Sequence, residues 1–267
     1  MESLAETALS AKAAVVAVWF VVLFAAERLR PADPARLMAG LKPPELRRLG
    51  RNFVLFLANF ALSPLIVVPL TVFAASLHAP WRPAWWQGGL GLALDIVALD
   101  FLLYWWHRAN HEVRFLWRFH SVHHLDATLD STSAVRFHFG EVLLSALARA
   151  AVIVAVGFPL VSVLAFESLI LIAAMFHHSN IALPPKFERA LSRVVITPSI
   201  HWVHHHARRG DTDSNYGTVF SFWDPLFGSR SRTAREPGMT IGIEGESEET
   251  LIALLLHPFR APVRRAA

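Results

Sequence analysis

Histidine is concentrated in one stretch of this 267-residue chain, where twelve of the fourteen histidines fall between positions 107 and 206. Most of them form three clusters, His107-x-x-x-His111, His120-x-x-His123-His124 and His201-x-x-His204-His205-His206. Residues three and four apart share one face of a helix, so each cluster presents two or three imidazoles in one direction. With His177 and His178 added, the clusters offer at least eight nitrogen ligands, about twice what one tetrahedral zinc ion takes. The pattern predicts a site for two metal ions.

The composition is too apolar for an ordinary soluble domain of this size. Hydrophobic residues make up 54% of the chain and charged residues only 17%, with nine tryptophans and nineteen phenylalanines. These proportions indicate a membrane protein. The chain has no cysteine, which excludes disulfides, thiolate-bound zinc and iron–sulfur clusters. Any metal must therefore be held by imidazole or carboxylate groups.

Four apolar runs divide the chain. They cover residues 11–26, 53–77, 88–106 and 142–176, and the last is interrupted by Arg149 and by Gly157-Phe158-Pro159. We interpret the first as a retained helix rather than a signal peptide, because no basic segment precedes it and no small-residue cleavage site follows. The length of the fourth suits two short helices or a re-entrant hairpin better than one span. We therefore expect an all-α, integral-membrane helical bundle with a cytoplasmic histidine-rich metal-binding cap.

The basic residues report topology. The net charge of +4 raises the possibility of a nucleic-acid partner, but the basic residues crowd into connections beside the apolar runs, so we expect no such partner. Between the second and third runs, the only Lys or Arg among residues 78–87 is Arg82. Between the first two runs there are seven basic residues, Arg28, Arg30, Arg36, Lys42, Arg47, Arg48 and Arg51. This bias places the N-terminus outside and the histidine clusters in the cytoplasm, and we expect a bacterial inner-membrane location.

Asp100 stands out within the third apolar run. Asp100, Tyr104, His107 and His111 follow one another at spacings of four, three and four, so they form one helical stripe. An ionisable group inside a membrane run is costly unless it faces a polar interior, and is therefore a candidate functional residue. We predict that Asp100 acts from outside the ligand set, either by accepting a hydrogen bond from a ligating imidazole or by lining a channel.

Imidazole alone does not identify the metal, since it binds zinc, copper, nickel and iron. A zinc peptidase helix needs H-E-x-x-H, which His111-Glu112-Val113-Arg114-Phe115 does not supply. Soluble di-iron bundles use paired Glu-x-x-His ligands, and the sequence has no such pair. Three functions stay open on these grounds. They are an oxygen-activating lipid oxidase, a divalent-metal transporter and a zinc-dependent lipid hydrolase with Glu112 or Glu141 as its base.

Six motifs between about residues 100 and 228 carry a resemblance to a known superfamily. Four contain clustered histidines, namely Tyr104-Trp-Trp-His107-Arg108-x-x-His111, Leu116-Trp117-x-x-His120-x-x-His123-His124, Phe176-His177-His178-Ser179-Asn180 and His201-x-x-His204-His205. The others are Arg136-Phe-His138-x-x-Glu141 and Asn215-Tyr216-Gly217 followed by Trp223-Asp224-Pro-Leu-Phe227-Gly228. In these motifs the chain resembles the fatty acid hydroxylase and sterol desaturase superfamily of integral-membrane, histidine-rich di-iron oxygenases.

The resemblance implies a ligand set and a domain division. The implied ligands are His107, His111, His120, His123, His124, His201, His204 and His205, with His178 as a ninth and His138 as a further candidate. Glu141 takes a catalytic supporting role beside Asp100. Where bacterial relatives have proline after the histidine of the Arg-x-His segment, this chain has Phe139, which leaves the orientation of His138 open. The catalytic domain would cover residues 89–235, between N-terminal membrane helices and a basic loop (1–88) and a C-terminal tail (236–267).

The resemblance also implies the reaction and its partners. Two iron ions, or zinc in their place, would act with O2 on a C–H bond of a lipid, by hydroxylation or desaturation. Because the chain shows no flavin, nucleotide or haem motif, a separate electron donor such as a reductase, ferredoxin or cytochrome is implied. Sterols, hopanoids, carotenoids, fatty acyl chains and sphingoid bases are all long apolar molecules, so the sequence leaves the substrate open.

Overall fold

The computed structural model describes residues 2–39, 43–77, 82–247 and 250–260 as a bundle of long helices with a cap of short ones. The helices of the bundle are α1 (Glu2–Leu29), α3 (Pro43–Leu62) with its continuation α4 (Val68–Ser76), α5 (Gly88–Glu112), α7 (Phe139–Val156) and α8 (Leu160–His178). The remaining helices are α2 (Pro34–Ala39), α6 (Arg114–His124), α9 (Pro185–Leu191), α10 (Pro198–His204), α11 (Arg209–Thr212), α12 (Trp223–Leu226) and α13 (Leu251–Leu256). In these ranges isolated bridges are the only β-structure. The predicted all-α class is confirmed.

Four stretches among the described residues are long and apolar enough to cross a membrane. They are Glu45–Ser76, Gly88–Glu112, Phe139–Val156 and Leu160–His178. The first combines α3 and α4 through a π-helical turn, Ser63–Val67, in which Pro64 removes a backbone donor without ending the helix. α1 covers the predicted first run and lies along α8. The chain therefore has the helices of an integral-membrane protein.

The predicted break in the fourth apolar run is also confirmed. α7 ends at Gly157, whose φ of 74° is the left-handed conformation that glycine adopts at a helix C-terminus. Pro159 then precedes the first turn of α8. At 1.5 Å per residue, α7 and α8 are each about 27–29 Å long, so each approaches the thickness of a bilayer core. The chain thus returns to the end where α7 began, which places His177 and His178 beside the other clusters.

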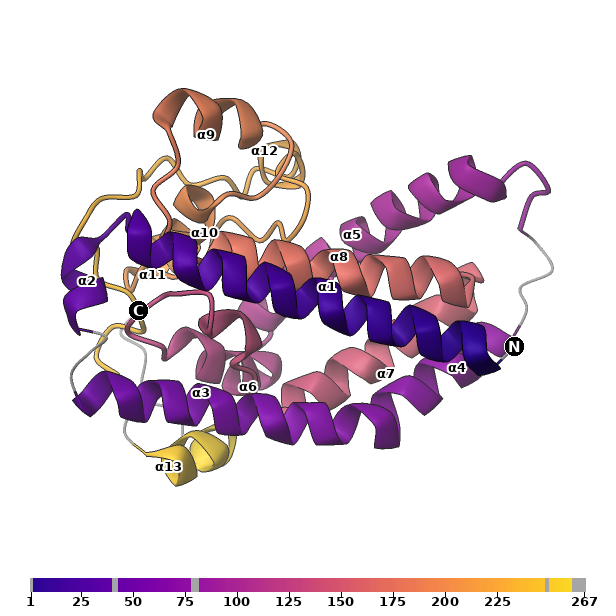
Figure 1. The fold of residues 1–267 in the computed structure, drawn as a ribbon, viewed down its shortest axis with the longest axis horizontal. Helices are drawn as coiled ribbons and strands as arrows, with labels where there is room; N and C mark the ends of the chain where they lie inside the picture. Colours follow the sequence, from indigo (N-terminus) through magenta and orange to yellow (C-terminus); the bar gives the residue numbers. More distant parts are fainter. Residues whose placement is uncertain (1, 40–42, 78–81, 248–249, 261–267) are drawn as a thin grey trace.

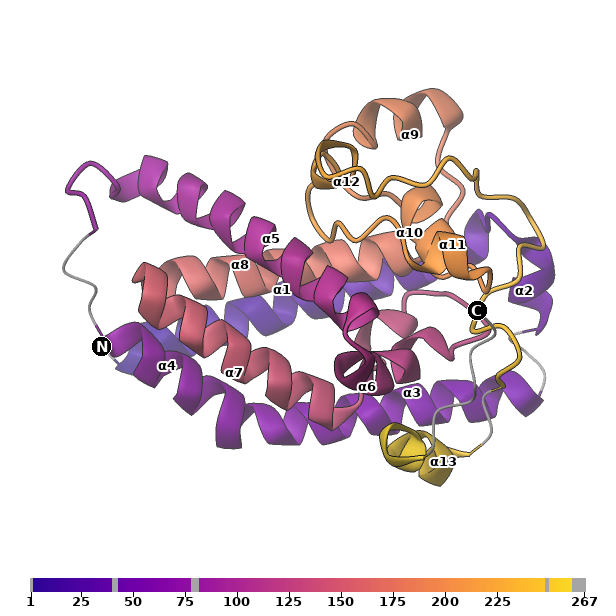
Figure 2. The ribbon, with the colours of Figure 1, turned by 180° about the vertical axis from the view of Figure 1, so that it is seen from behind.

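The cap lies at the end of the bundle away from the N-terminus, where α6, α10 and α11 gather (Figures 1 and 2). A buried ion pair joins it to α3. Arg48 Nη1 is 2.9 Å from Asp126 Oδ2, and both side chains are almost fully buried. Arg48 also pairs with Glu45 and Asp130. Basic residues that the sequence assigned to topology alone therefore also hold the histidine-bearing segment. The connections around Lys42 and Pro80 lie outside the described residues.

Candidate metal centre

Nine histidines form two groups at the junction of the bundle and the cap. In each group the nitrogens lie within 4.8 Å of one another. The larger group takes its members from α5, α6 and α10, and contains His107, His111, His120, His124 and His204. The smaller takes its members from α6, α8 and the end of α10, and contains His123, His178, His201 and His205. α6 and α10 contribute to both groups, which therefore lie side by side.

Backbone and carboxylate acceptors fix three imidazoles of the larger group. His107 Nδ1 donates to the carbonyl of Tyr216 at 2.8 Å, and His204 Nδ1 donates to the carbonyl of Ser214 at 2.6 Å. His120 Nδ1 donates to Glu141 Oε1 at 2.7 Å. A neutral imidazole that donates through Nδ1 keeps a lone pair on Nε2. Each of the three rings therefore turns Nε2 toward the group as a ligand atom.

In the smaller group, Nε2 atoms face one another at short range. His178 Nε2 is 3.1 Å from His123 Nε2 and 3.0 Å from His201 Nε2. The Nδ1 atom of His123 donates to the Arg136 carbonyl, and that of His178 to the Ala174 carbonyl. In the neutral rings both Nε2 atoms then carry lone pairs, so their close approach needs a cation between them.

Burial keeps four imidazoles of the two groups neutral. Burial lowers the pKa of His204 to about 3. It also lowers the pKa of His123, His124 and His205 well below the ordinary value, and neighbouring histidines add to that effect. Several ring nitrogens, among them both of His111 and both of His124, are buried without a hydrogen-bond partner. Neutral, unpartnered, convergent nitrogens are costly without a cation. The donor set fits two metal ions with a preference for nitrogen ligands.

The Asn215-Tyr216-Gly217 turn supports this centre. The sequence did not indicate that supporting role. Asn215 adopts a positive φ of 53°. Asp224 accepts hydrogen bonds from the backbone N–H groups of Tyr216 at 2.7 Å and Gly217 at 3.0 Å. A Cβ on Gly217 would lie 2.8–2.9 Å from Ile196, Asp224 and Phe220, so only glycine fits. The turn thereby presents the Tyr216 carbonyl to His107.

Asp100 lies on the same helix as His107 but serves the loop instead of an imidazole. Its carboxylate accepts hydrogen bonds from the backbone N–H groups of Val219 at 3.2 Å and Phe220 at 3.0 Å. It also accepts one from the Trp223 indole at 2.8 Å. Asp100 is 1% exposed, so these donors satisfy a carboxylate inside the protein. They replace the predicted bond from a ligating imidazole, and Asp100 acts by anchoring the loop that follows the Tyr216 turn.

Glu141 and His138 lie close together at the start of α7 and have different surroundings. Glu141 contacts His120, so it acts on a histidine of the larger group. His138 lies outside both groups, because its Nδ1 accepts from the Gly140 N–H and caps α7, while its Nε2 donates to the Leu255 carbonyl. With both nitrogens engaged, His138 has no lone pair for a metal. We therefore leave it out of the ligand set that the sequence suggested.

Two more histidines flank the centre. His177 is buried with its ring centroid 4.0 Å from that of His201, but it belongs to neither group. His206 bonds to Asp211 at 2.9 Å, beyond the centre.

Arg136 donates to the carbonyl of Val122 at 2.9 Å and to Asn52. These bonds fasten the Arg136 side chain to α6 and α3. They thereby position the Arg136 carbonyl, which accepts the hydrogen bond from His123.

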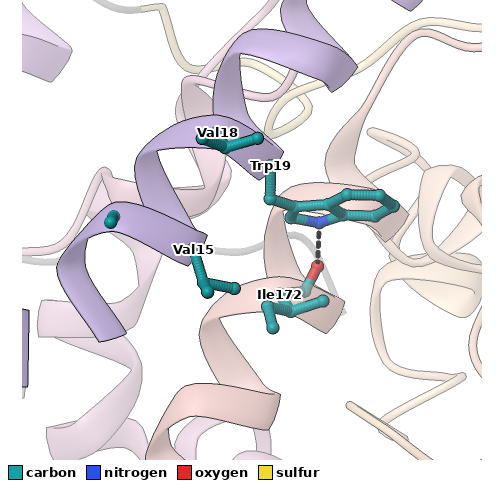
Figure 3. A pocket seen from close by; sticks show the side chains of 5 residues that line it. Val15, Val18, Trp19 and Ile172 are labelled. Carbon is teal, nitrogen blue, oxygen red and sulfur yellow. Dashed lines mark hydrogen bonds between the residues drawn. The ribbon is translucent and has the colours of Figure 1, made fainter. Parts of the chain in front are cut away.

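α1 is fastened to the helix that carries His178. The Trp19 indole donates to the Ile172 carbonyl at 3.0 Å across a shallow apolar groove of about 380 Å³ between α1 and α8 (Figure 3). Val15 and Val18 form the α1 side of the groove. Ile172 precedes His178 by six residues, about 9 Å along the helix. The groove therefore lies within the apolar part of the bundle rather than at the metal centre.

The sequence profile of the fatty acid hydroxylase family matches residues 92–229, just over half of the chain. This chain belongs to the fatty acid hydroxylase family. The matched residues contain all nine histidines of the two groups, and also Asp100, Glu141 and the Tyr216 turn. The family resemblance in the sequence is thus confirmed, and it covers the part of the molecule where the groups form.

The fatty acid hydroxylase domain is similar to several lipid-modifying enzymes. Ornithine lipid hydroxylase OlsE of Rhizobium tropici is 29% identical over 76% of this chain and 60% of its own length. Alkylglycerol monooxygenase of Homo sapiens is 28% identical over 75% of this chain and 42% of its own length. Very-long-chain aldehyde decarbonylase GL1-5 of Oryza sativa subsp. indica is 26% identical over 64% of this chain and 29% of its own length. The chain thus spans less than two thirds of these relatives. No solved structure matches it.

Proposed function

We propose that this chain is a membrane-bound, O2-dependent oxidoreductase that hydroxylates an aliphatic C–H bond of a lipid. Two iron ions and electrons from a separate donor would take part. The observation that carries the proposal is the pair of histidine groups, nine imidazoles from four elements at the end of a bundle of membrane-spanning length. Two iron ions held there would supply the activation of dioxygen, which side chains alone do not perform.

The proposed ligands are the members of the two groups. One ion would be held by His107, His111, His120, His124 and His204, the other by His123, His178, His201 and His205. The chain's own groups keep each ring in place through Nδ1 and leave Nε2 for the metal. Eight of the nine histidines are buried and His107 is half-buried. This burial keeps bulk water away from the centre.

The relatives support a lipid substrate with a long aliphatic chain. Their names refer to an ornithine lipid, an alkylglycerol and a very-long-chain aldehyde, and the first two name a hydroxylase and a monooxygenase. We therefore favour hydroxylation over desaturation. The helices of spanning length end at the histidine groups, so a lipid in the bilayer would approach the metals from the membrane side.

The position of the histidines along the helices and the contacts of two glutamates distinguish this proposal from its alternatives. A metal transporter needs ligands near the middle of its spans, whereas His107 and His111 lie in the last two turns of α5, and His178 ends α8. A zinc-dependent hydrolase needs a carboxylate to activate water. Glu112 is exposed and paired with Arg108, and Glu141 bonds to His120 through one oxygen. Neither alternative accounts for two adjacent groups of histidines.

Metal analysis combined with isotope labelling tests the proposal. Purified protein should contain about two iron ions per chain. Cells that express it should accumulate lipids that are heavier by one oxygen atom, about 16 Da under ordinary O2 and about 18 Da under 18O2. Cells that express His124→Ala at the same level should lack these lipids. Zinc as the native metal, with hydrolysed lipids and no oxygen from O2, would establish the hydrolase instead.

We also propose a cytoplasmic metal centre, which the basic connection between α1 and α3 favours. Reporter domains fused after Asp213 and after Trp85 should be found on opposite sides of the membrane, with Asp213 in the cytoplasm. A reporter after Asp213 on the outer face would exclude a cytoplasmic reductant.

A further inference from the structure

The segment formed by α13 and the 3-10 turn His257–Phe259 is apolar apart from His257, which pairs with Glu246. One face is buried, because Leu254 packs against Leu55, Val122 and Leu125. On the other sides Ile252 is 68% exposed, Leu256 50% and Phe259 66%. A helix that is apolar all round is normally enclosed by protein or by lipid, and none of the described residues encloses these exposed side chains.

The exposure does not come from a loose end. Thr250 caps α13 by accepting a hydrogen bond from the Ala253 N–H at 3.1 Å. The Leu255 carbonyl accepts one from His138 at 3.1 Å. The Phe259 ring lies edge-on to that of Phe119, with centroids 6.0 Å apart. These contacts hold the segment firmly against α6 and the start of α7.

The segment lies at the level where the spans begin. Phe259 packs beside His138, with ring centroids 6.3 Å apart, and His138 is the N-cap of α7. The first residue of that span, Phe139, is 39% exposed. On α3, the neighbour of α13 in Figures 1 and 2, Phe53 is 58% exposed and Phe60 66%. The exposed apolar surface at the start of α7 therefore continues through His138 onto the segment.

We propose that residues 251–259 lie on the surface of the bilayer, with Ile252, Leu256 and Phe259 among the acyl chains. Arg260 follows at the position where a basic side chain meets lipid phosphates. Through Leu254, which touches Val122 and Leu125, this contact holds α6 at the membrane surface. α6 carries three of the nine clustered histidines. The lipid contact would thus fix the height of the metal centre above the acyl chains.

The absence of cysteine allows a direct test with spin labels. Single variants Ile252→Cys and Leu256→Cys carry a nitroxide in full-length protein, reconstituted in vesicles of phosphatidylethanolamine and phosphatidylglycerol. Collision with O2, which concentrates in lipid, is compared with collision with a water-soluble nickel chelate. Phe60→Cys is the lipid reference, and Ala234→Cys, an exposed position in the cap, is the aqueous reference.

We expect the ratio of O2 to nickel collisions at positions 252 and 256 to exceed that at position 234 at least threefold and to lie below that at position 60, which is in the middle of its span. A ratio like that at position 234 would overturn the inference. Shielding from both reagents would also overturn it, since it would show that protein covers the face. All four positions are exposed, so labelling leaves the packed core intact.

Discussion

His123 and His124 are adjacent in the sequence, but their imidazoles belong to different histidine groups. The same holds for His204 and His205. The rings of His124 and His205, one from each group, stack with centroids 4.3 Å apart. One peptide bond in α6 and one at the end of α10 therefore set the separation of the two proposed metals. Two ions held by these groups would lie side by side, and each would have its own ligands.

Single substitutions should thus remove one metal at a time. We expect His124→Ala to empty the five-histidine site and His205→Ala to empty the four-histidine site, because each removes a ligand and leaves a cavity. Each variant should bind about half the metal of the unchanged protein and have no detectable turnover. Elemental analysis checks this, with His257→Gln, outside both groups, as the control. Full metal content in both variants would show that the groups are not metal sites.

Glu141 should tune the larger group through His120. Glu141→Gln keeps an acceptor for the His120 N–H but removes the negative charge, which makes the imidazole a poorer ligand. We expect metal affinity or turnover to fall roughly ten- to a hundredfold, the range for a lost partner of a ligating histidine. The matched control is Glu112→Gln, since Glu112 is exposed and pairs only with Arg108 among the described ion pairs. Equal effects of the two substitutions would exclude the role assigned to Glu141.

The membership of the two histidine groups taken together was largely predictable from the sequence. Spacing of four residues places His107 with His111, His120 with His124 and His201 with His205, and each pair shares a group. The assignment of His123 and His204 to the opposite group was not predictable. It depends on how α5, α6, α8 and α10 cross, and no local pattern records that. The apolar runs and the break at Gly157 were readable because hydropathy and glycine act locally.

The roles of single polar residues were less accessible. Asp100 was recognised as unusual because it interrupts an apolar run, but its partners Val219 and Phe220 lie about 120 residues away. His138 matched a family motif, and only its contact with Leu255, 117 residues away, shows that both ring nitrogens are engaged. A side chain's chemistry can be predicted from its type, whereas its partner is set by tertiary packing.

Removal of one partner of the buried pair between Arg48 and Asp126 should strongly destabilise the protein. Asp126→Asn leaves the Arg48 guanidinium buried without its full countercharge, and removal of one partner of a buried pair costs about 3–5 kcal/mol. In a chain of this size we expect the melting temperature in detergent to fall by roughly 6–15 °C. Glu112→Gln breaks the half-exposed pair with Arg108 and should cost less than about 1 kcal/mol. Similar shifts for the two would contradict this account.

The metal-free protein should lose stability in acid. Burial lowers the pKa of His204 to about 3 and those of His123, His124 and His205 well below the ordinary value. Below pH about 6.5 the unfolded chain binds protons at these rings and the folded chain does not, so stability falls as the pH decreases. Each ring contributes up to about 1.4 kcal/mol per pH unit between the two pKa values.

Thermal unfolding of chelator-treated protein from pH 8 to pH 4 checks this sign. We expect little change above pH 7 and a steep decrease in melting temperature below pH 6.5. Protein loaded with metal should resist acid to a lower pH, because bound ions compete with protons for Nε2. A melting temperature that is constant from pH 7 to pH 4 without metal would mean that these rings are not held neutral.

Asp100 and Asp95 provide a matched pair on α5. Both are 1% exposed, and Asp95 pairs with Arg82, whereas Asp100 holds the Val219–Trp223 loop. Replacement of either by Asn turns an amide N–H₂ toward buried donors, at a cost of about 1–3 kcal/mol. Only Asp100 is linked to the centre, because the loop it anchors follows directly after the Tyr216 carbonyl that receives the His107 N–H.

Both variants should melt at lower temperature, but Asp100→Asn alone should weaken metal binding at the five-histidine site. Titration of that site in folded protein at 10 °C, with Asp95→Asn for comparison, separates this effect from stability. Equal affinities in the two variants would reduce Asp100 to a packing role.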